Sequence, residues 1–406
     1  MKNLQLAWRN IWRNKRRTII TVMSVFFAVV LSILMGSMQE GIYGSMIDNV
    51  VKTYTGHIQI QHVDYNENQS INNVIEQRDG LLDEIVSIDG VEVAVPRLKS
   101  FSLISNGNKT KGGALIGIHP AKEEQLTELS QWIVKGEFLA KNDRGLLVTK
   151  NIANHLQVGI GDTLILMSQG YHGTNAAGLY PVKGILAFPT QELNNLGVYL
   201  HIDAAREFFY ADNKLTEIAL LINDYAKVPQ VEETLMRKFG DQYNYLTWQE
   251  LSPELVNFIN SDKASAVLML GILYLVIGFG ILGTILMMMA ERRREMGVMV
   301  AVGMQKRRLS AIIWMETMLI AFIGVVVGFL FSWPLITYLS ANPIPITGEY
   351  GAAYEQFGLE PVLFFKVVPQ VFFNQVFTVL AVTLAISIYP YYYIRRLNTI
   401  DAIRGN

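Results

Sequence analysis

Long uncharged stretches dominate the pattern of hydrophobic and polar residues along this chain. Four of them carry no charge, or a single acid, over more than the roughly 20 residues that a helix needs to cross about 30 Å of hydrocarbon. They are residues 18–39, 264–290, 309–339 and 367–394. Because the apolar runs of buried core helices are usually shorter, the pattern predicts four transmembrane helices. A secretory signal is the alternative for 18–39, but no small-x-small cleavage site ends that run, which favours an uncleaved span.

The polar segment between the first two spans, residues 40–263, is long enough to bury a core of its own. Residues 81–98 predict a helix, a turn and a strand that ends at Pro96. Further strand-like runs are predicted over 56–61, 114–118, 144–158, 161–166, 180–188, 198–202 and 217–223, with one helix among them, and a mobile hairpin tip or loop over 168–178. The expected fold is therefore a membrane protein with four transmembrane α-helices and a large extracytoplasmic α+β domain.

The remaining segments complete the predicted plan. Residues 1–17 place Leu4, Trp8, Ile11 and Trp12 on one helical face, which is typical of an amphipathic helix in the membrane interface. A single helix is expected to continue from Pro253 through the second span. Residues 291–308 form the connection between spans two and three, 340–366 a short outer loop, and 395–406 a tail.

Charge sets the expected orientation. Of the 16 Lys and Arg outside residues 40–263, only Lys366 does not flank the inner side, so both termini are expected in the cytoplasm and the large domain outside. Residues 40–263 hold 18 Lys and Arg against 28 Asp and Glu, a net charge of −10. An acidic outer domain argues against nucleic acid as a partner. The chain has no Cys, so no disulfide holds this domain together.

Enzyme motifs are missing from the chain. It contains no HExxH, no GxSxG and no Cys nucleophile, and its six His are scattered without metal-ligand spacing. No Gly-Lys dipeptide occurs, which excludes a Walker A lysine. We therefore expect no catalytic residue, no metal and no cofactor in this chain. If ATP drives the protein, a partner ATPase binds the ATP and Mg²⁺.

Residues 291–308, "ERRREMGVMVAVGMQKRR", are the most informative stretch. Topology alone explains the basic residues, but not the apolar island between them, which is expected to bury against something. Gly297 and Gly303 are expected to interrupt the helix, and a short amphipathic helix docking into a soluble partner fits the island. We call residues 291–308 the coupling segment. Its expected contact residues are Glu291, Arg292, Glu295, Met296, Ala301, Gly303, Met304, Lys306 and Arg307.

Two polar or small features stand out inside the spans. Glu316 is the one acid in the third apolar run, and we expect it to tie that helix to nearby basic residues rather than to relay protons. Gly324 and Gly328 form a GxxxG, which permits close helix packing. The stretch "GFGILG" at 278–283 adds small residues to the second span.

These features together resemble the FtsX-like and MacB-like permeases, the type VII ABC transporters that work by mechanotransmission. "AWRNIWRNKRRTIITVMSV" is similar to the family's amino-terminal helix and first span. The coupling segment with the third span is similar to its central region, and "YPYYYIRRLNTIDAIRG" to its end. Outside the membrane, "SIDGVEVAVPRL", "GIHPAKE" and "LQVGIGDTLIL" resemble the MacB-like periplasmic core domain, expected here as two lobes. In layout the chain is most similar to the lipoprotein-releasing (Lol) permeases.

The resemblance implies a permease subunit, without enzymatic activity of its own, in the bacterial inner membrane. Two such subunits, identical or paralogous, would pair with two cytoplasmic ABC ATPase subunits, encoded separately, and with a periplasmic chaperone or adaptor. A Lol-type permease would extract lipoproteins from the membrane lipid. The residues that would touch their acyl chains are Ile33, Leu34, Met35 and Met38.

Two alternatives stay open at this stage. One is a MacB-like exporter of drugs or peptides that works with an adaptor and an outer-membrane channel. The other is an FtsX-like signalling subunit that regulates a cell-wall hydrolase.

Overall fold

The computed structural model of this chain describes residues 2–13, 15–141, 143–188, 191–348 and 361–396. They form two compact units, each assembled from separate parts of the chain. The helical unit comprises residues 1–44, 258–344 and 362–406, and the sheet unit comprises residues 45–257 and 345–361. The predicted tail lies outside the described residues from 397 onward, as do residues 349–360 of the predicted outer loop.

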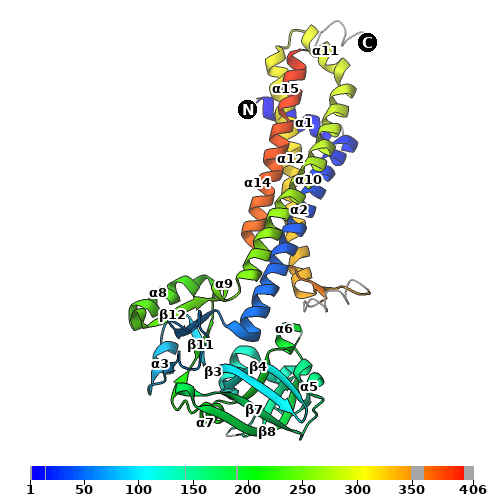
Figure 1. The fold of residues 1–406 in the computed structure, drawn as a ribbon. Helices are drawn as coiled ribbons and strands as arrows, with labels where there is room; N and C mark the ends of the chain where they lie inside the picture. Colours follow the sequence, from blue (N-terminus) through cyan, green and yellow to red (C-terminus); the bar gives the residue numbers. More distant parts are fainter. Residues whose placement is uncertain (1, 14, 142, 189–190, 349–360, 397–406) are drawn as a thin grey trace. The chain divides into compact units, whose positions relative to one another are not determined.

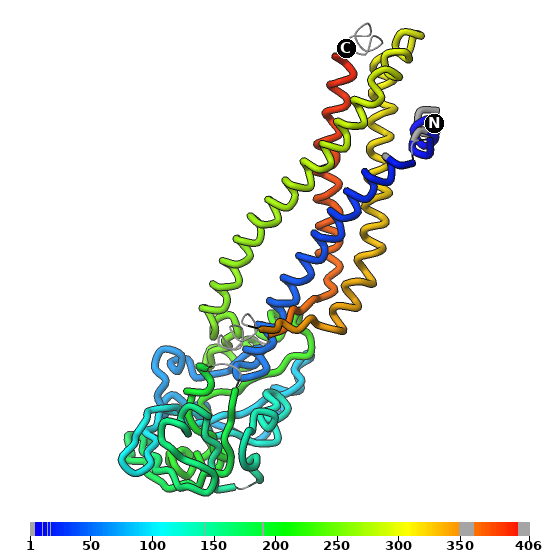
Figure 2. The backbone as a smooth tube through the Cα atoms, turned by 90° about the vertical axis from the view of Figure 1, so that its right-hand side faces the viewer, coloured from blue at the N-terminus to red at the C-terminus, as the bar shows by residue number. Residues whose placement is uncertain are grey.

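Long helices make up the helical unit, where they lie side by side (Figures 1 and 2). They are α2 (Lys15–Val50), α10 (Pro253–Glu291), α12 (Lys306–Ala341) and α14 (Pro369–Ile386), which continues into α15 (Ile388–Arg395). Their apolar stretches give four helices long enough to cross a membrane within the described part of the chain. Helix α10 begins at Pro253, which confirms the predicted start.

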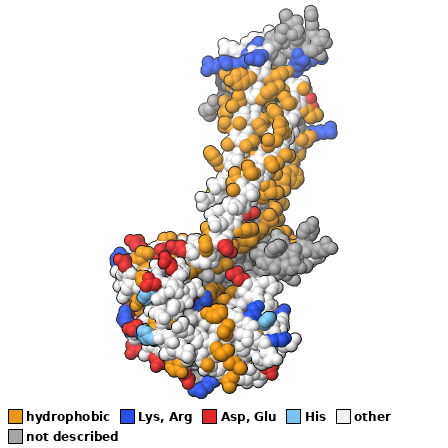
Figure 3. Space-filling view, in the orientation of Figure 1, with side chains coloured by type: hydrophobic (Ala, Val, Ile, Leu, Met, Phe, Trp, Pro, Cys, Tyr) orange, Lys and Arg blue, Asp and Glu red, His pale blue; other side chains and the backbone are white. Residues whose placement is uncertain are grey.

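Two shorter helices lie at the predicted inner end of this unit, α1 (Lys2–Arg13) and α11 (Arg293–Ala301). Helix α1 packs against α12, with Ala7 and Ile11 buried and Trp8 and Trp12 exposed. Figure 3 shows hydrophobic side chains along the long helices and Lys and Arg gathered at this end. The charge pattern of the sequence therefore has a counterpart on the folded surface of the unit.

Aromatic and apolar side chains fill the interior of the helical bundle. Phe372 of α14 is fully buried, and its ring centroid lies 5.9 Å from that of Phe329 and 5.1 Å from that of Trp333 on α12. Ile33 of α2 and Ile285 of α10 belong to the same buried cluster.

A ten-stranded mixed sheet forms the centre of the sheet unit. Its strands follow the order β12-β1-β11-β3-β4-β9-β6-β8-β5, and β7 pairs with β3 and β8. Their bounds are β1 Ile58–His62, β3 Val91–Asn106, β4 Lys109–Ile118, β5 Ile133–Gly136, β6 Leu146–Thr149, β7 Thr163–Gln169, β8 Asn175–Leu186, β9 Gly197–His201, β11 Glu217–Ile222 and β12 Tyr243–Thr247. Most neighbours are antiparallel, but β4 with β9 and β6 with β8 run parallel.

Short helices connect and cover the strands of the sheet unit. They are α3 (Leu81–Val86), α4 (Pro120–Thr127), α5 (Lys150–Leu156), α6 (Gln191–Asn194), α7 (Ile202–Phe209), α8 (Val228–Phe239) and α9 (Trp248–Leu251). A π-helical turn, Val51–Thr55, follows α2. The small strands are β2 (Ile75–Glu76), β10 (Lys214–Leu215), β13 (Ile344–Pro345) and β14 (Val362–Leu363). The expected mixture of helix and strand is confirmed.

Two local predictions need revision. Strand β3 continues past Pro96 to Asn106. Strand β4 begins to pair with β3 only at Arg97. The missing N–H of Pro96 therefore interrupts no hydrogen bond between β3 and β4. Of the two alternatives for residues 168–178, the hairpin tip is confirmed and the loop is not. They form the turn of the β7–β8 hairpin together with the strand residues on both sides of it.

Candidate functional site

The coupling segment folds as the end of α10, the short helix α11 and a tight turn before α12. Gly303 adopts φ 103°, a conformation that residues other than glycine rarely accept. The N–H of Met304 donates to the Met299 carbonyl at 3.0 Å, and the N–H of Gly303 donates to the Val300 carbonyl at 3.1 Å. These two bonds form a Schellman motif that ends α11. Gly297, in contrast, lies buried inside α11, so the expected interruption there is wrong.

The apolar island divides into a buried and an exposed side. Met296 is 1% exposed and packs in the bundle core, whereas Val302 is 83% exposed. Val298 and Ala301 are also exposed. The helical period of α11 therefore leaves only part of the predicted apolar island as a surface at the predicted inner end of the unit.

A buried ion pair fixes the start of this segment. Nη1 of Arg292 lies 2.7 Å from both carboxylate oxygens of Glu316, and both side chains are almost completely buried. Nε of Arg292 lies 3.6 Å from Glu295, which is itself 3.2 Å from Nη2 of Arg13 on α1. The network links α1, α10, α11 and α12. Arg292 and Met296, listed above as contact residues, therefore hold the segment from inside instead of offering a surface.

A groove runs between α1, α11 and α12 beside this network. Its volume is about 610 Å³. Leu6, Met299 and Ile312 supply apolar walls, while Arg13 and Arg294 are charged residues of its lining. An apolar groove with charged residues along it suits an amphipathic element of another protein.

Helices α2 and α12 approach most closely at the two glycines of the GxxxG. A Cβ atom on Gly324 would lie 2.8 Å from Cβ of Val25, and one on Gly328 would lie 2.9 Å from Cβ of Val29. Real Cβ contacts are almost never that short, so only glycine fits at this spacing.

The four residues expected to touch acyl chains do not share one exposed face. Ile33 is fully buried in the bundle core, and Leu34 and Met38 pack against the same core. Met35 is partly exposed and does not belong to that cluster. Ile33 is therefore removed from the expected contact set, because a side chain without exposed surface cannot reach a ligand in this conformation.

Helix α10 carries the largest apolar surface of the bundle that other helices leave uncovered. The side chains of Val267, Leu268, Ile272 and Phe279 are 65–72% exposed. Such a surface requires lipid, cargo or another protein around it.

In the sheet unit, a buried arginine organises the entry of the chain from α2. Arg97, 1% exposed, donates from Nη2 to Glu123 at 2.6 Å and from Nη1 to Glu217 at 3.2 Å. Nη1 also donates to the Tyr54 carbonyl at 2.6 Å, in the π-helical turn after α2. Sequence reasoning did not single out Arg97, because its partners come from distant parts of the chain.

An exposed apolar face lies on three neighbouring strands of the same unit. Leu103 of β3 pairs in register with Met167 of β7, and Ile165 of β7 with Leu179 of β8. With Phe101 these residues are 38–68% exposed. We call Phe101, Leu103, Ile165, Met167 and Leu179 the hairpin face. Exposed clusters of this kind on a sheet are typical of contact surfaces for other molecules.

No group of three or more His, Cys, Asp or Glu among the described residues could hold a metal ion. Two of the scattered histidines nevertheless meet: the ring centroids of His119 and His201 lie 6.2 Å apart. Burial lowers the pKa of His201, against the opposing effect of Asp203.

Comparison with known proteins places the chain among membrane transport proteins. A model of the MacB-like periplasmic core domain matches residues 18–238, and a model of the FtsX-like permease C-terminal region matches residues 267–399. An uncharacterized ABC transporter permease of Methanocaldococcus jannaschii is 20% identical over 335 residues, which are 80% of this chain and 81% of that protein.

A longer relative is the macrolide export ATP-binding/permease protein MacB of Nitrobacter winogradskyi. It is 23% identical over 338 residues, which are 78% of this chain and 50% of that protein. The chain thus spans about half the length of this relative. Among solved structures, the periplasmic region of MacB from Actinobacillus actinomycetemcomitans aligns over 51% of this chain and 95% of that one, with 13% identity and a TM-score of 0.37.

Proposed function

We propose that this chain, which belongs to the FtsX-like permeases with a MacB-like periplasmic core domain, extracts acylated proteins from the outer leaflet of its membrane. Family membership makes it an ABC transporter permease, a membrane protein with an extracellular domain, and implies an ATPase partner. The cargo, the direction of movement and the arrangement of subunits are our proposal. The membrane would be the bacterial inner membrane, with both termini in the cytoplasm.

The exposed apolar length of α10 is the observation that carries this proposal. Only 6% of the most apolar stretch of α10 is buried, against 44% in the first candidate span. An acyl chain is as apolar as this surface, so it could reach α10 sideways from the lipid without crossing a polar barrier. Leu268 and Ile272, rather than Ile33, would then be the first residues to meet it.

The coupling segment would receive the force that drives extraction. The groove between α1, α11 and α12 would take an apolar element of the ATPase, with Val298, Ala301 and Val302 beside it. The Arg13–Glu295–Arg292–Glu316 network would then carry a displacement of α11 into α10 and α12. This chain would catalyse nothing, and two copies of the ATPase would bind the ATP and Mg²⁺ beneath two permease subunits.

The hairpin face would be the contact for a periplasmic chaperone or adaptor. A chaperone that shields acyl chains needs apolar surface, and the hairpin face offers five large apolar side chains on adjacent strands. The buried Arg97 would hold the turn after α2 firmly to the sheet, so that β3 and β11 would move together with that turn.

Reconstitution with the ATPase in lipid nanodiscs tests this function. A fluorescent triacylated protein should leave the nanodisc only with ATP and an acceptor chaperone, and it should stimulate ATP hydrolysis. Ala301→Asp should abolish release while the permease still inserts and folds, because a charge replaces exposed apolar surface on the coupling segment. Gln305→Asp is the control: it places the same charge on the same segment, at an exposed residue that is not an expected contact and does not line the groove. Release that is equally fast without ATP would contradict the proposal.

Export of a small amphiphilic compound is the second candidate function. The observation that favours it is the relative named as a macrolide exporter, which aligns over 78% of this chain. The same nanodisc assay separates the two functions: a macrolide, and not the acylated protein, should then stimulate ATP hydrolysis.

A further inference from the structure

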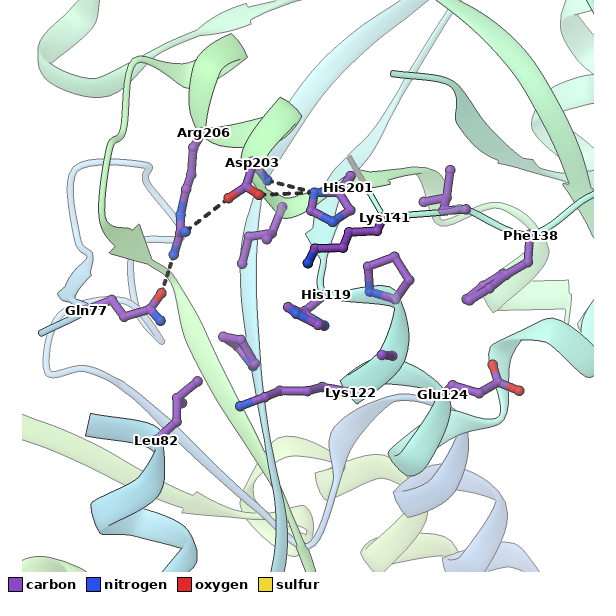
Figure 4. Close-up of a pocket in the computed structure, with 15 residues that line it drawn as sticks. Gln77, Leu82, His119, Lys122, Glu124, Phe138, Lys141, His201, Asp203 and Arg206 are labelled. Carbon is purple, nitrogen blue, oxygen red and sulfur yellow. Dashed lines mark hydrogen bonds and ion pairs between the residues drawn. The ribbon is translucent and has the colours of Figure 1, made fainter. Parts of the chain in front are cut away.

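A cavity of about 710 Å³ lies within the sheet unit, where two parallel strands end side by side (Figure 4). Strands β4 and β9 run in register, with Ile118 opposite His201. His119 follows β4 and begins α4, whereas His201 ends β9 and begins α7. The parallel pairing therefore brings two strand-to-helix junctions, each with a histidine, to one wall of the cavity.

Positive charge in this cavity is only partly compensated. Arg206 pairs with Asp203 at 3.4 Å and donates to Gln77, as Figure 4 shows. The Glu124 carboxylate accepts hydrogen bonds from the backbone N–H and the hydroxyl of Ser130.

Lys122 and Lys141 differ from these residues. No carboxylate among the described residues lies within ion-pair distance of either ammonium group. Two ammonium groups lining one concave site, without a counter-ion from the described residues, favour an anionic ligand.

The histidine pair adds hydrogen-bonding capacity to the same wall. Nδ1 of His201 already accepts a bond from the Asp203 backbone N–H at 3.3 Å. Nδ1 of His119 is buried and makes no hydrogen bond to any described residue. A buried polar atom without a partner destabilises the fold, and a rotation of the His119 ring toward the cavity would let a bound ligand supply the missing hydrogen bond.

Apolar residues complete the lining of the cavity. Phe138 and Leu139 line it from the segment after β5, and Leu82 lines it from α3. A free inorganic ion would leave this surface unused. A ligand with an anionic group and a compact apolar body would use both parts of the lining.

We propose that this cavity binds a small soluble organic anion, whose carboxylate or phosphate lies between Lys122, Lys141 and His119 and whose apolar part lies against Phe138 and Leu139. The site is separate from the proposed function, because the cavity is in the outer domain and needs neither the coupling segment nor α10. Occupancy of the site would be a signal that the outer domain senses, whatever the cargo is.

Phenyl phosphate is a suitable probe, because it joins a phosphate to an apolar ring. Ligand-observed NMR with the full chain in phosphatidylcholine nanodiscs should detect saturable binding of phenyl phosphate. Inorganic phosphate should bind more weakly and phenol not at all. Lys122→Gln with Lys141→Gln should raise the dissociation constant about tenfold or more, since two charge contacts are lost.

The matched control is Lys109→Gln with Lys111→Gln. It removes the same charge from the same unit, on β4 and outside the cavity, and should leave the dissociation constant unchanged. Equal weakening by both double variants would show that general surface charge attracts the probe, and would overturn the proposal. Absence of saturable binding to the wild type would also overturn it.

A lipid headgroup is the other source of the same anionic chemistry. Adding phosphatidylglycerol to the nanodiscs should not displace phenyl phosphate if the ligand is soluble. Competition by phosphatidylglycerol would contradict that part of the proposal. None of these results depends on release of an acylated protein, so failure here and failure of the proposed function are distinguishable.

Discussion

Helices α10 and α12 are similarly long and similarly apolar, yet they are used differently. In their most apolar stretches, 39% of α12 is buried but only 6% of α10. Helix α10 contains four glycines and α12 contains two. Cβ atoms on Gly324 and Gly328 of α12 would collide with α2, whereas Cβ atoms on Gly271, Gly280 and Gly283 of α10 would meet nothing within 4 Å. Glycine therefore indicates close helix packing only where a second helix supplies a matching surface.

Polar links rather than close packing hold much of α10 to its neighbours. Tyr43 of α2 donates to Asp262 at 2.6 Å, Tyr274 donates to Gln375 of α14, and Arg292 pairs with Glu316 of α12. Apolar packing is concentrated near the coupling segment, at Ile281, Ile285 and Met289. Helix α10 is thus fixed firmly at one end and attached by a few bonds elsewhere, which fits the proposal that α11 transmits a displacement to α10.

The largest expected effect comes from the ion pair that joins the two helices. Glu316→Ala should lower the free energy of unfolding by about 3–5 kcal/mol, because the buried Arg292 would lose its 2.7 Å partner and keep only the longer 3.6 Å contact with Glu295. The measurement is unfolding in mixed micelles titrated with sodium dodecyl sulfate. Arg292→Met combined with Glu316→Met should recover most of the loss. A double variant no better than Glu316→Ala would show that the carboxylate acts through another contact.

A smaller effect is expected from the glycines that distinguish α12 from α10. Gly324→Leu should cost about 1–3 kcal/mol of stability in the same titration, because it forces α12 away from Val25. Gly280→Leu makes the same chemical change on α10 and should stay within about 0.5 kcal/mol of the wild type. Equal destabilisation by the two changes would mean that α10 packs as closely as α12.

The smallest effect is expected where α10 is attached by a single bond. Tyr43→Phe removes only the hydroxyl that donates to Asp262 and should cost about 1 kcal/mol. Tyr338→Phe, at an exposed position of α12, is the matched control and should change nothing measurable. If Tyr43→Phe is silent as well, the Tyr43–Asp262 bond does not hold α10 in place.

The helices of this fold follow from the sequence more directly than the sheet does. Uncharged runs located the spans, because a membrane helix satisfies its backbone hydrogen bonds within one segment. The start of α10 at Pro253 also follows from the local sequence, because proline is favoured at the first position of a helix. The end predicted for β3 at Pro96 is wrong, because the effect of that proline depends on where β4 begins to pair with β3. Such pairing is a property of two strands together and cannot be read from one.

The sequence predicted candidate sites where a single residue differed in polarity or charge from its neighbours. Glu316 stood out as the one acid in an apolar run, and a tie to basic residues was expected; the partner proved to be Arg292. The buried face of α11 was not predicted from the sequence. Contacts with α1 and α12 decide which side of this nine-residue helix faces the bundle. The cluster around Arg97 and the meeting of His119 with His201 depend on strand order, which periodicity does not reveal.

Photo-crosslinking from α10 tests the central claim most directly, namely that its exposed surface receives the acyl chains of the cargo. A benzophenone amino acid at Ile272, 65% exposed, would be compared with one at Leu330 of α12, 63% exposed. The account predicts that a triacylated protein in the nanodisc crosslinks at Ile272 and not at Leu330, and that ATP with the ATPase and chaperone removes the crosslink. Equal crosslinking at both positions, unchanged by ATP, would contradict it.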